Sequence, residues 1–492
     1  MLALLKIGGI AFVLAGMYIL PLIYLCHRKR TGLIDKCLAG VVVLIPAVLF
    51  FVAISLITAN VPFWDDYDAI MRYVCRPTME RMVHLFDLHN QHRIVTVRLF
   101  LEGMVALTGK VDFKVCMLCG SAQLLIVFIC FSFFYIRQFG KILGLIFVSS
   151  CSWLLFSLHN FANAFWALTA IQNFGVIMWA FLAITFFHFR SRRGCCISAW
   201  GCAAIAVFTS AQGLAVLVIF SFMLLLAPQD APGYEQTFNW PGLIKHVFNR
   251  IRSFRYGSAI LVSLMLTVIC SYFYMKGFSP GEVELRSASA SMFDKILYVV
   301  AFLGNPVMLL PLAIAVGSVV IVAFVFIAIS FPRLPKLMRP LFFFSLFLLA
   351  CDIAGVNFRA ESPYSGLCYR YYIIVACLYI SLLGLLLSLI RFNSKWYRRL
   401  GVSISYLCSF FCLVFTLLFW RQLEERSESL RVNLLTWPQS NDGLRYDETR
   451  IEEASNALEQ MEKKGLYDHA TVRRKGEALP ETTVPWVELH FP

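Results

Sequence analysis

Three aspartates, Asp65, Asp66 and Asp68, lie within four positions of the stretch "VPFWDDYDAIMRY", directly after a long apolar run. Neighbouring carboxylates repel one another unless a cation or a proton-donating ligand relieves the repulsion. A carboxylate within hydrogen-bond distance of a hydroxyl group can also act as its general base. We therefore expect this cluster to accept a proton from a hydroxyl-bearing substrate, with Asp66 as the preferred base and Asp65 as the second candidate. The alternative is a set of solvated aspartates at the start of a helix.

A second group of residues suits a sugar ring. In "SLHNFANAFWALTAIQN", His159, Asn163 and Trp166 share one face of a predicted helix, and Gln172 closes the segment. Uncharged amide groups beside an aromatic ring can bind sugar hydroxyl groups and the apolar face of a pyranose. The alternative is an interfacial cap with a tryptophan at the level of the lipid headgroups.

A third group suits a phosphate. Arg359 and Arg370 occur in "NFRAESPYSGLCYRYY", just before an apolar run, and Tyr371 follows Arg370. The guanidinium group matches phosphate oxygens with two parallel hydrogen bonds. An arginine in this position can therefore hold a lipid phosphate at the depth of the headgroups. The alternative is a snorkelling arginine beside interfacial tyrosines.

The composition places all these residues in a membrane protein. Of 492 residues, 59% are hydrophobic and 15% are charged, and the mean hydropathy is +0.73. Such values are typical of a bundle of membrane-spanning helices and not of soluble globular domains. The net charge of +14 does not indicate nucleic-acid binding, because most lysines and arginines lie in short clusters between apolar runs. The cysteines lie mostly inside the apolar runs and show no zinc-binding spacing.

The apolar runs predict an all-α polytopic membrane protein with about twelve transmembrane helices. A span needs about 20 apolar residues, and the polar turn Thr209–Gly213 divides one long apolar region into two runs. The predicted runs are 7–26, 37–59, 114–136, 142–158, 173–189, 196–209, 211–227, 256–275, 306–330, 341–354, 370–390 and 400–420.

The charge bias of the loops predicts the orientation of the chain. Loops such as 27–36 and 190–193 are basic and almost free of acidic residues, so the positive-inside rule places them in the cytoplasm. The aspartates and both termini then face the other side. We expect two regions, a transmembrane region 1–420 and a small C-terminal region 421–492. The latter is more polar and contains a predicted amphipathic helix with Ile451, Ala454, Leu458 and Met461 on one stripe.

The segment 60–113 is too long for a simple connection between spans. Apolar residues recur with helical spacing over 78–86, which predicts a helix lying in the membrane interface. Arg98 and Glu102 make 94–107 a poor span, so we expect this stretch to lie flat or to re-enter the membrane. The stretch between the two contributes four polar side chains, His89, Asn90, His92 and Arg93.

The chain resembles the GT-C superfamily of membrane glycosyltransferases. The resemblance rests on an acidic motif directly after a span, on an interfacial helix beyond it and on about a dozen spans. More narrowly, "FWDDYDAI", "HNQHR" and "YRYY" resemble the bacterial serotype-converting glucosyltransferases that modify O-antigen. The resemblance covers about residues 37–420, whereas the extra first span and the C-terminal region depart from the commonest arrangement.

The resemblance implies a GT-C-like, inverting glycosyltransferase in a bacterial inner membrane. It would move a hexose such as glucose from a polyprenyl-phosphate donor to a lipid-linked or surface glycan on the periplasmic side, where both termini would also lie. Asp66 or Asp65 would deprotonate the acceptor hydroxyl. The donor and its phosphate would be bound by Arg370, Arg359, Arg93, His92, His89 and Tyr371. The acceptor or the sugar would be bound by Asp68, Trp64, Asn90, His159, Asn163, Trp166 and Gln172.

The implied enzyme needs no cofactor. A divalent cation beside the aspartates is allowed, but the spacing does not require one, and we predict no metal site. Its partners would be the polyprenyl-phosphate sugar, a glycan acceptor and membrane lipid, but no nucleic acid. A donor-synthesising enzyme and a flippase would act upstream.

Three other functions fit parts of the sequence. A polymerase or ligase of lipid-linked oligosaccharides would use the same membrane surface, with an oligosaccharide-diphosphate lipid as donor. A transporter or flippase is disfavoured because the predicted spans carry almost no charge, Asp352 being the exception. A non-catalytic scaffold would make Asp66 and Arg370 dispensable.

Overall fold

The computed structural model describes residues 2–27, 32–226, 240–252, 254–279, 282–390, 394–437, 444, 450–474, 477, 480 and 483–486. This described part is built from helices and contains no β-strand, only an isolated bridge between His89 and His92. The prediction of an all-α polytopic chain is therefore confirmed at this level.

Each predicted apolar run corresponds to one helix. Within the described residues, nine helices are long and apolar enough to cross a membrane, and three apolar helices are shorter. Eight of the nine lie at α2 (Leu33–Ile57), α5 (Phe113–Phe139), α8 (Ala167–His188), α12 (Phe254–Met275), α15 (Leu310–Ile329), α16 (Arg339–Arg359), α17 (Tyr372–Leu389) and α18 (Ser394–Thr436). The ninth, Lys141–Ala164, begins with α6 (Lys141–Leu155) and ends with α7 (Phe161–Ala164). The three shorter apolar stretches lie in α1 (Leu2–His27), α9 (Cys195–Val207) and α10 (Leu214–Leu226).

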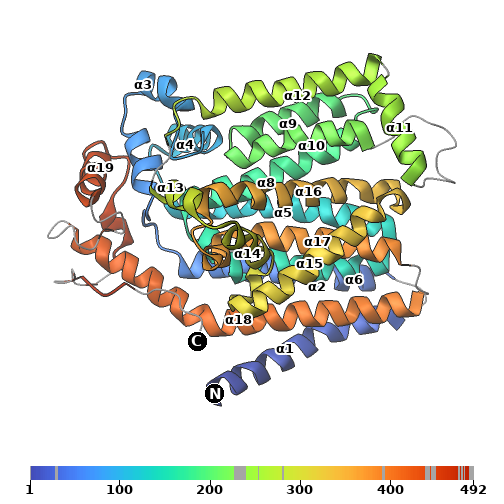
Figure 1. Ribbon diagram of the computed structural model, residues 1–492. Coiled ribbons are helices and arrows are strands. Elements are labelled where there is room, and N and C mark those ends of the chain that lie inside the picture. Colours follow the sequence, from blue (N-terminus) through green and yellow to red (C-terminus); the bar gives the residue numbers. More distant parts are fainter. Residues whose placement is uncertain are drawn as a thin grey trace.

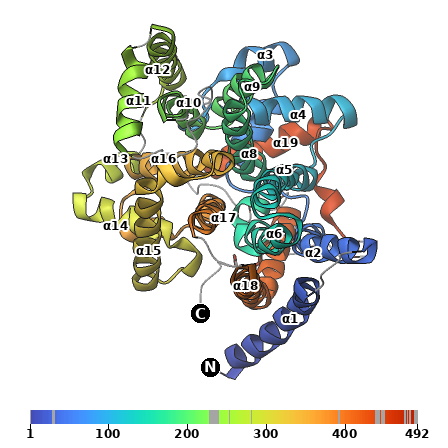
Figure 2. The ribbon, with the colours of Figure 1, turned by 90° about the vertical axis from the view of Figure 1, so that its right-hand side faces the viewer.

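The long helices lie side by side along one direction, and Figure 2 looks along the bundle (Figures 1 and 2). The helices α3 (Thr78–Val83), α4 (Val95–Thr108), α13 (Glu282–Ser289) and α19 (Ile451–Lys463) lie at one end, and α11 (Trp240–Arg252) lies at the other. Because α5 carries the chain from one end to the other, the basic stretch 137–141 lies opposite the aspartates.

Helix α4 lies across the spans, as predicted for 94–107. It is seen end-on in Figure 1 and lengthwise in Figure 2. Its two charged residues fasten the preceding turn. Arg98 is buried and donates hydrogen bonds to the carbonyl oxygens of Leu85 (2.9 Å) and Asp87 (2.7 Å), while Glu102 forms an ion pair with Arg81 at 2.8 Å. Carbonyl groups at a helix end need such donors, because the helix itself supplies none.

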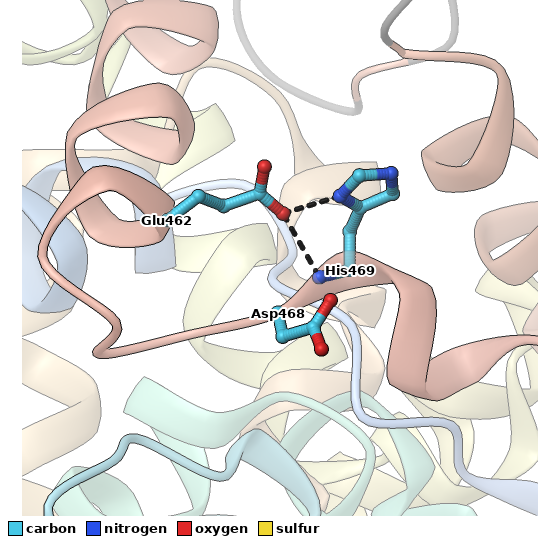
Figure 3. Close-up of side chains that lie close together, drawn as sticks. All are labelled: Glu462, Asp468 and His469. Carbon is cyan, nitrogen blue, oxygen red and sulfur yellow. Dashed lines mark hydrogen bonds and ion pairs between the residues drawn. The ribbon is translucent and has the colours of Figure 1, made fainter.

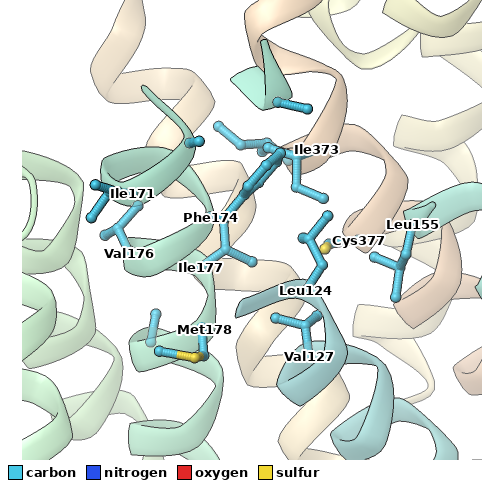
Figure 4. Close-up of a cluster of buried hydrophobic side chains, with 14 of the residues drawn as sticks. Leu124, Val127, Leu155, Ile171, Phe174, Val176, Ile177, Met178, Ile373 and Cys377 are labelled. Atoms are coloured by element: carbon cyan, nitrogen blue, oxygen red, sulfur yellow. The ribbon is translucent and has the colours of Figure 1, made fainter. Parts of the chain in front are cut away.

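The centre of the bundle is a packed apolar layer between α5, α8 and α17, which contains Leu124, Phe174 and Ile373 (Figure 4). Lipid tails are as apolar as these side chains, so helix association in a membrane depends on close packing. Gly120 provides the close approach, because a Cβ atom there would lie 2.5 Å from the backbone of Ala170 on α8. This layer fixes the beginnings of α8 and α17, which carry candidate site residues.

The C-terminal region is continuous with the transmembrane bundle. The boundary predicted after residue 420 falls inside α18, which runs for 43 residues without interruption. The predicted amphipathic helix is α19, whose residues Ala454, Leu458 and Met461 are buried. Beyond α19, the Tyr467 hydroxyl donates a hydrogen bond to the carbonyl oxygen of Asn60 at 2.6 Å. The C-terminal region thus packs directly on the segment 60–113, which carries Asp65, Asp66 and Asp68 and is called the aspartate segment below.

Candidate functional site

A cavity of about 480 Å³ lies between the aspartate segment and the ends of several spans. Such a volume is typical of a small-ligand site. Many of the predicted site residues line it, from four separate parts of the chain: Asp65, His89, Asn90, His92, Gln172, Arg359, Arg370 and Tyr371.

The lining is polar at one part and apolar at another. The apolar part comes from membrane helices, with Val218 on α10, Met275 on α12 and Phe358 on α16 among its residues. Small residues on one face of α16, including Ala354 and Gly355, keep this part open. The cavity can therefore hold a ligand with a polar head and an apolar chain.

The two adjacent aspartates have different environments. Asp66 is fully buried, and its carboxylate accepts hydrogen bonds from the backbone N–H groups of Phe63 (3.0 Å) and Leu168 (2.9 Å). Burial raises the pKa of Asp66 to about 8, although both backbone donors favour the charged form. Asp66 therefore ties the segment to α8 and does not line the cavity. Asp65 lines the cavity, and no described residue donates a hydrogen bond or an ion pair to its carboxylate. Asp65, and not the preferred Asp66, is therefore the carboxylate that a ligand in the cavity can reach.

His92 lies on a two-residue turn with His89. Backbone hydrogen bonds of 2.7 and 2.9 Å join the two histidines, and Asn90 between them has a φ of +51°, which asparagine tolerates better than most residues. His92 Nδ1 accepts a hydrogen bond from the backbone N–H of Ala211 at 3.3 Å. Burial, with the positive charges of Arg359 and Arg370, lowers the pKa of His92 to about 3. The ring is therefore neutral, and its Nε2–H is a donor that can face a ligand.

Asp68 does not line the cavity but lies behind His89. Its carboxylate contacts His89 Nδ1 at 3.4 Å and Arg72 at 2.7 Å. The hydrogen bond with His89 is the largest cause that lowers the pKa of Asp68 to about 2. Asp68 is therefore a negatively charged support for His89 and not a direct ligand-binding residue. Its place, the π-helical turn Tyr67–Arg72, is a type of distortion that is frequent at functional sites.

Arg370 is the cation most open to a ligand among the arginines predicted here. Its guanidinium lies over the ring of Trp166, 4.4 Å from the centroid, and no described carboxylate forms an ion pair with it. Asn163 donates a hydrogen bond to the carbonyl oxygen of Arg370 at 2.8 Å and accepts one from Asn173 at 2.7 Å. Asn163 and Trp166 therefore position Arg370 from behind, in place of the predicted contact with sugar. Arg359 lies over the ring of Tyr371 at 5.8 Å and also lines the cavity.

Several buried polar atoms at the cavity have no hydrogen-bond partner among the described residues. They are His89 Nε2, Gln172 Nε2 and the hydroxyl groups of Tyr298 and Tyr371. Buried polar groups in proteins are normally paired, so these atoms indicate a polar ligand or ordered water. Asp352, the charged residue predicted inside a span, is buried in α16 and does not line the cavity.

Three predicted site residues have other roles. Arg93 uses its side-chain donors on backbone carbonyl oxygens, including those of Tyr274 (2.8 Å) and Lys276 (2.7 Å), and so holds the turn against the end of α12. His159 is buried between the rings of Phe415 and Tyr372. Trp64, which has a φ of +52°, is exposed and lies outside the cavity lining.

Other polar residues of the cavity were not among the predicted site residues. Ser210 and Gln212 belong to the turn that divides α9 from α10, and Tyr298 comes from α14 (Met292–Leu303). The signal for the turn was present, because it interrupts an apolar region with polar residues. Nothing in the local sequence distinguishes Tyr298 from an interfacial tyrosine.

A separate cluster in the C-terminal region has a geometry compatible with a metal ion. Ligand atoms of Glu462, Asp468 and His469 lie within 4.8 Å of one another (Figure 3). Hydrogen bonds already account for the cluster. Glu462 accepts them from the His469 ring and from its backbone N–H at 3.0 Å, and Asp468 accepts one from the N–H of Ala470 at 2.9 Å. These contacts join the end of α19 to the following turn.

Comparison with protein-family models, with curated proteins and with solved structures gives no match. The resemblance to the GT-C superfamily therefore rests on the sequence motifs quoted above.

Proposed function

We propose that the chain is a glycosyltransferase that takes a sugar from a polyprenyl-phosphate donor and transfers it to a glycan acceptor on the periplasmic face of the inner membrane. The observation that carries the proposal is the cavity itself. Asp65, two histidines, Arg359 and Arg370 share one cavity with an apolar lining from α10, α12 and α16. The donor combines a sugar, a phosphate and an apolar polyprenyl chain. The cavity offers polar side chains, arginines and an apolar lining that suit these three parts.

The proposed reaction is a single displacement that inverts the anomeric centre. The acceptor hydroxyl oxygen forms a bond to the anomeric carbon while the bond from that carbon to the phosphate oxygen breaks. Asp65 takes the hydroxyl proton, and polyprenyl phosphate leaves with the bonding electron pair. Arg370 and Arg359 stabilise the departing phosphate, because guanidinium groups form charge-assisted hydrogen bonds with phosphate oxygens.

The test is an assay of purified protein in lipid nanodiscs. A panel of radiolabelled polyprenyl-phosphate hexoses is incubated with lipid-linked glycan acceptors, and the wild type is compared with Asp65→Asn. We expect transfer from one donor by the wild type and a loss of at least about 100-fold in Asp65→Asn, since a positioned base contributes about 10²–10⁴-fold.

The same variant separates this proposal from its alternatives. If the protein moves the donor lipid across liposome membranes, and Asp65→Asn does so at the same rate as the wild type, a transporter would be favoured. Use of an oligosaccharide-diphosphate lipid, with no transfer from any monosaccharide donor, would favour a polymerase or ligase.

A further inference from the structure

His89 presents an unpaired nitrogen to the cavity. The side chain is 7% exposed and lines the cavity, and no described residue forms a hydrogen bond with Nε2. The other ring nitrogen, Nδ1, contacts the Asp68 carboxylate at 3.4 Å. A carboxylate accepts hydrogen bonds, so Nδ1 carries a proton toward Asp68, and Nε2 is the ring nitrogen left for a ligand. His89 therefore offers Nε2 to a ligand at the cavity wall.

The other histidine of the turn is a hydrogen-bond donor. His92 Nδ1 accepts from the N–H of Ala211, so its Nε2 carries the proton and acts as a donor. Both side chains line the same cavity. A hydroxyl group both donates and accepts hydrogen bonds, whereas an ionised phosphate oxygen only accepts. A hydroxyl group can therefore pair with His89 Nε2 as well as with the His92 Nε2–H donor.

The support for His89 continues into the C-terminal region. Arg72 contacts Asp68 at 2.7 Å and Glu453 of α19 at 3.0 Å, and Arg450 contacts Glu453 at 2.8 Å. Arg72 and Glu453 are each almost half exposed, and such surface pairs add little to stability. We therefore assign this pair a role in orientation and not in stability, because it fixes the Arg72 side chain, which in turn orients Asp68.

Helix α19 is itself held in place. Its buried face includes Ala454, Leu458 and Met461. After the helix, Lys464 donates a hydrogen bond to the carbonyl oxygen of Cys75, and the carbonyl oxygen of Leu466 accepts one from the N–H of Val111 at 2.8 Å. These contacts reach both the middle and the end of the aspartate segment.

We propose that His89 Nε2 forms a hydrogen bond with a hydroxyl group of the sugar carried by the donor lipid, and that the C-terminal region positions His89 through Glu453, Arg72 and Asp68. This inference rests on the proposed function, because it assigns a binding role within the same site. His89 is a substrate-binding residue, and Asp68, Arg72 and Glu453 are positioning residues.

The first test combines a protein variant with substrate variants. Transfer from deoxy analogues of the donor sugar is measured with the wild type, with His89→Gln and with His89→Phe. In the wild type, one deoxy position should lower kcat/KM by about 10-fold, the range for one hydrogen bond. That loss should disappear in His89→Phe, which cannot form the hydrogen bond, and return in part in His89→Gln. Equal losses in the wild type and in His89→Phe at every position would overturn the proposal.

The second test does not depend on transfer. Diethyl pyrocarbonate modifies histidine nitrogen atoms, and mass spectrometry gives the rate at His89. Polyprenyl-phosphate glucose, or the hexose lipid active in the transfer assay, should slow this modification at least 5-fold more than polyprenyl phosphate without sugar. Equal protection by both lipids, or by neither, would contradict the assigned contact. Protection without any transfer would instead retain the contact and reject the transferase.

The C-terminal link has a matched control on the same helix. Glu459 of α19 forms an ion pair with Lys463, one helical turn later, at 2.6 Å. Glu453→Gln should change the modification rate at His89 and raise the donor KM by about 3-fold, while Glu459→Gln should change neither. Glu453→Asp, which keeps the carboxylate, should recover part of the effect. Identical behaviour of Glu453→Gln and Glu459→Gln would remove the C-terminal region from the site.

Discussion

The guanidinium of Arg370 lies over the Trp166 indole, with its central carbon 4.4 Å from the ring centroid. Trp166 and Arg370 are separated by more than 200 residues, and Asn163 fixes the backbone of Arg370 from the same side. An arginine whose face contacts an aromatic ring keeps the N–H donors at its edge available to a ligand. The pair therefore gives the cavity a cation with a fixed orientation.

Replacement of Arg370 by lysine should impair the proposed reaction. A lysine retains the charge but has neither the planar pair of donors nor the same stacking. We expect kcat/KM for the lipid donor to fall by about 10–100-fold, the range for losing a hydrogen bond to a charged group. Steady-state kinetics in nanodiscs measure the change. Arg421→Lys is the control, because Arg421 is exposed on α18 and pairs with Glu425. Unchanged donor kinetics in Arg370→Lys would refute the phosphate-binding role.

Asp65→Asn and Asp66→Asn should have different effects. Asp66 accepts backbone hydrogen bonds on both oxygens, and an asparagine would turn one NH₂ group toward a backbone N–H. An unsatisfied buried donor costs about 1–3 kcal/mol, so Asp66→Asn should lower the melting temperature. Asp65→Asn should leave the melting temperature unchanged and abolish transfer. Thermal unfolding in detergent and the transfer assay are measured on the same samples, and the reverse pattern would restore Asp66 as the base.

Filling the apolar part of the cavity should block the lipid donor. A Cβ atom on Gly355 would lie 3.4 Å from the Tyr298 hydroxyl, so the larger side chain of Gly355→Leu would occupy the lining. We expect a donor KM at least 10-fold higher. Gly201→Leu on α9 is the matched control, since a Cβ there meets nothing within 4 Å. Normal donor use by Gly355→Leu would place the polyprenyl chain elsewhere.

The Asp68 interactions should give a pH-dependent stability. The pKa of Asp68 is about 2 in the folded chain and 3.8 in its ordinary state. A lowered pKa stabilises the fold above the ordinary value, and this stabilisation is lost as the pH falls through 3.8 toward 2. The free energy of unfolding of the wild type should therefore exceed that of Asp68→Asn by about 2 kcal/mol at pH 7. This difference should become smaller at pH 3. Glu459→Gln should follow the wild type throughout, and a constant gap for Asp68→Asn would contradict the ion-pair role.

The helices could be predicted because their signal is local. Each apolar run gave one helix, and Arg98 and Glu102 were sufficient to exclude 94–107 as a span. Counting the spans also predicted that the aspartates and the basic stretch 137–141 lie at opposite ends of the bundle. The end of α18 could not be predicted, because its polar continuation beyond residue 420 is helical through contacts with the C-terminal region, such as the pairing of Arg431 with Glu477.

The membership of the cavity was partly predictable, but the roles of its residues were not. Residue type identified Asp65, His92 and Arg370 as candidates, since charged and polar residues at the edge of spans are few. Asp65 and Asp66 cannot be separated by type or spacing, because what distinguishes them is the N–H of Leu168, about 100 residues away. His159 was misassigned for the same reason, since its ring stacks on residues of α17 and α18.

The length of α18 has a practical consequence for imaging. At 1.5 Å per residue, its 43 residues span about 65 Å, more than twice the roughly 30 Å hydrocarbon core of a bilayer. The same continuous helix thus runs along the bundle and, past the bend seen in Figure 1, extends beyond it, and just beyond its end Trp437 donates a hydrogen bond to Ser455 of α19 at 2.8 Å. An antibody fragment that recognises α19 would be rigidly coupled to the intramembrane helices and would serve as an alignment marker for electron cryo-microscopy.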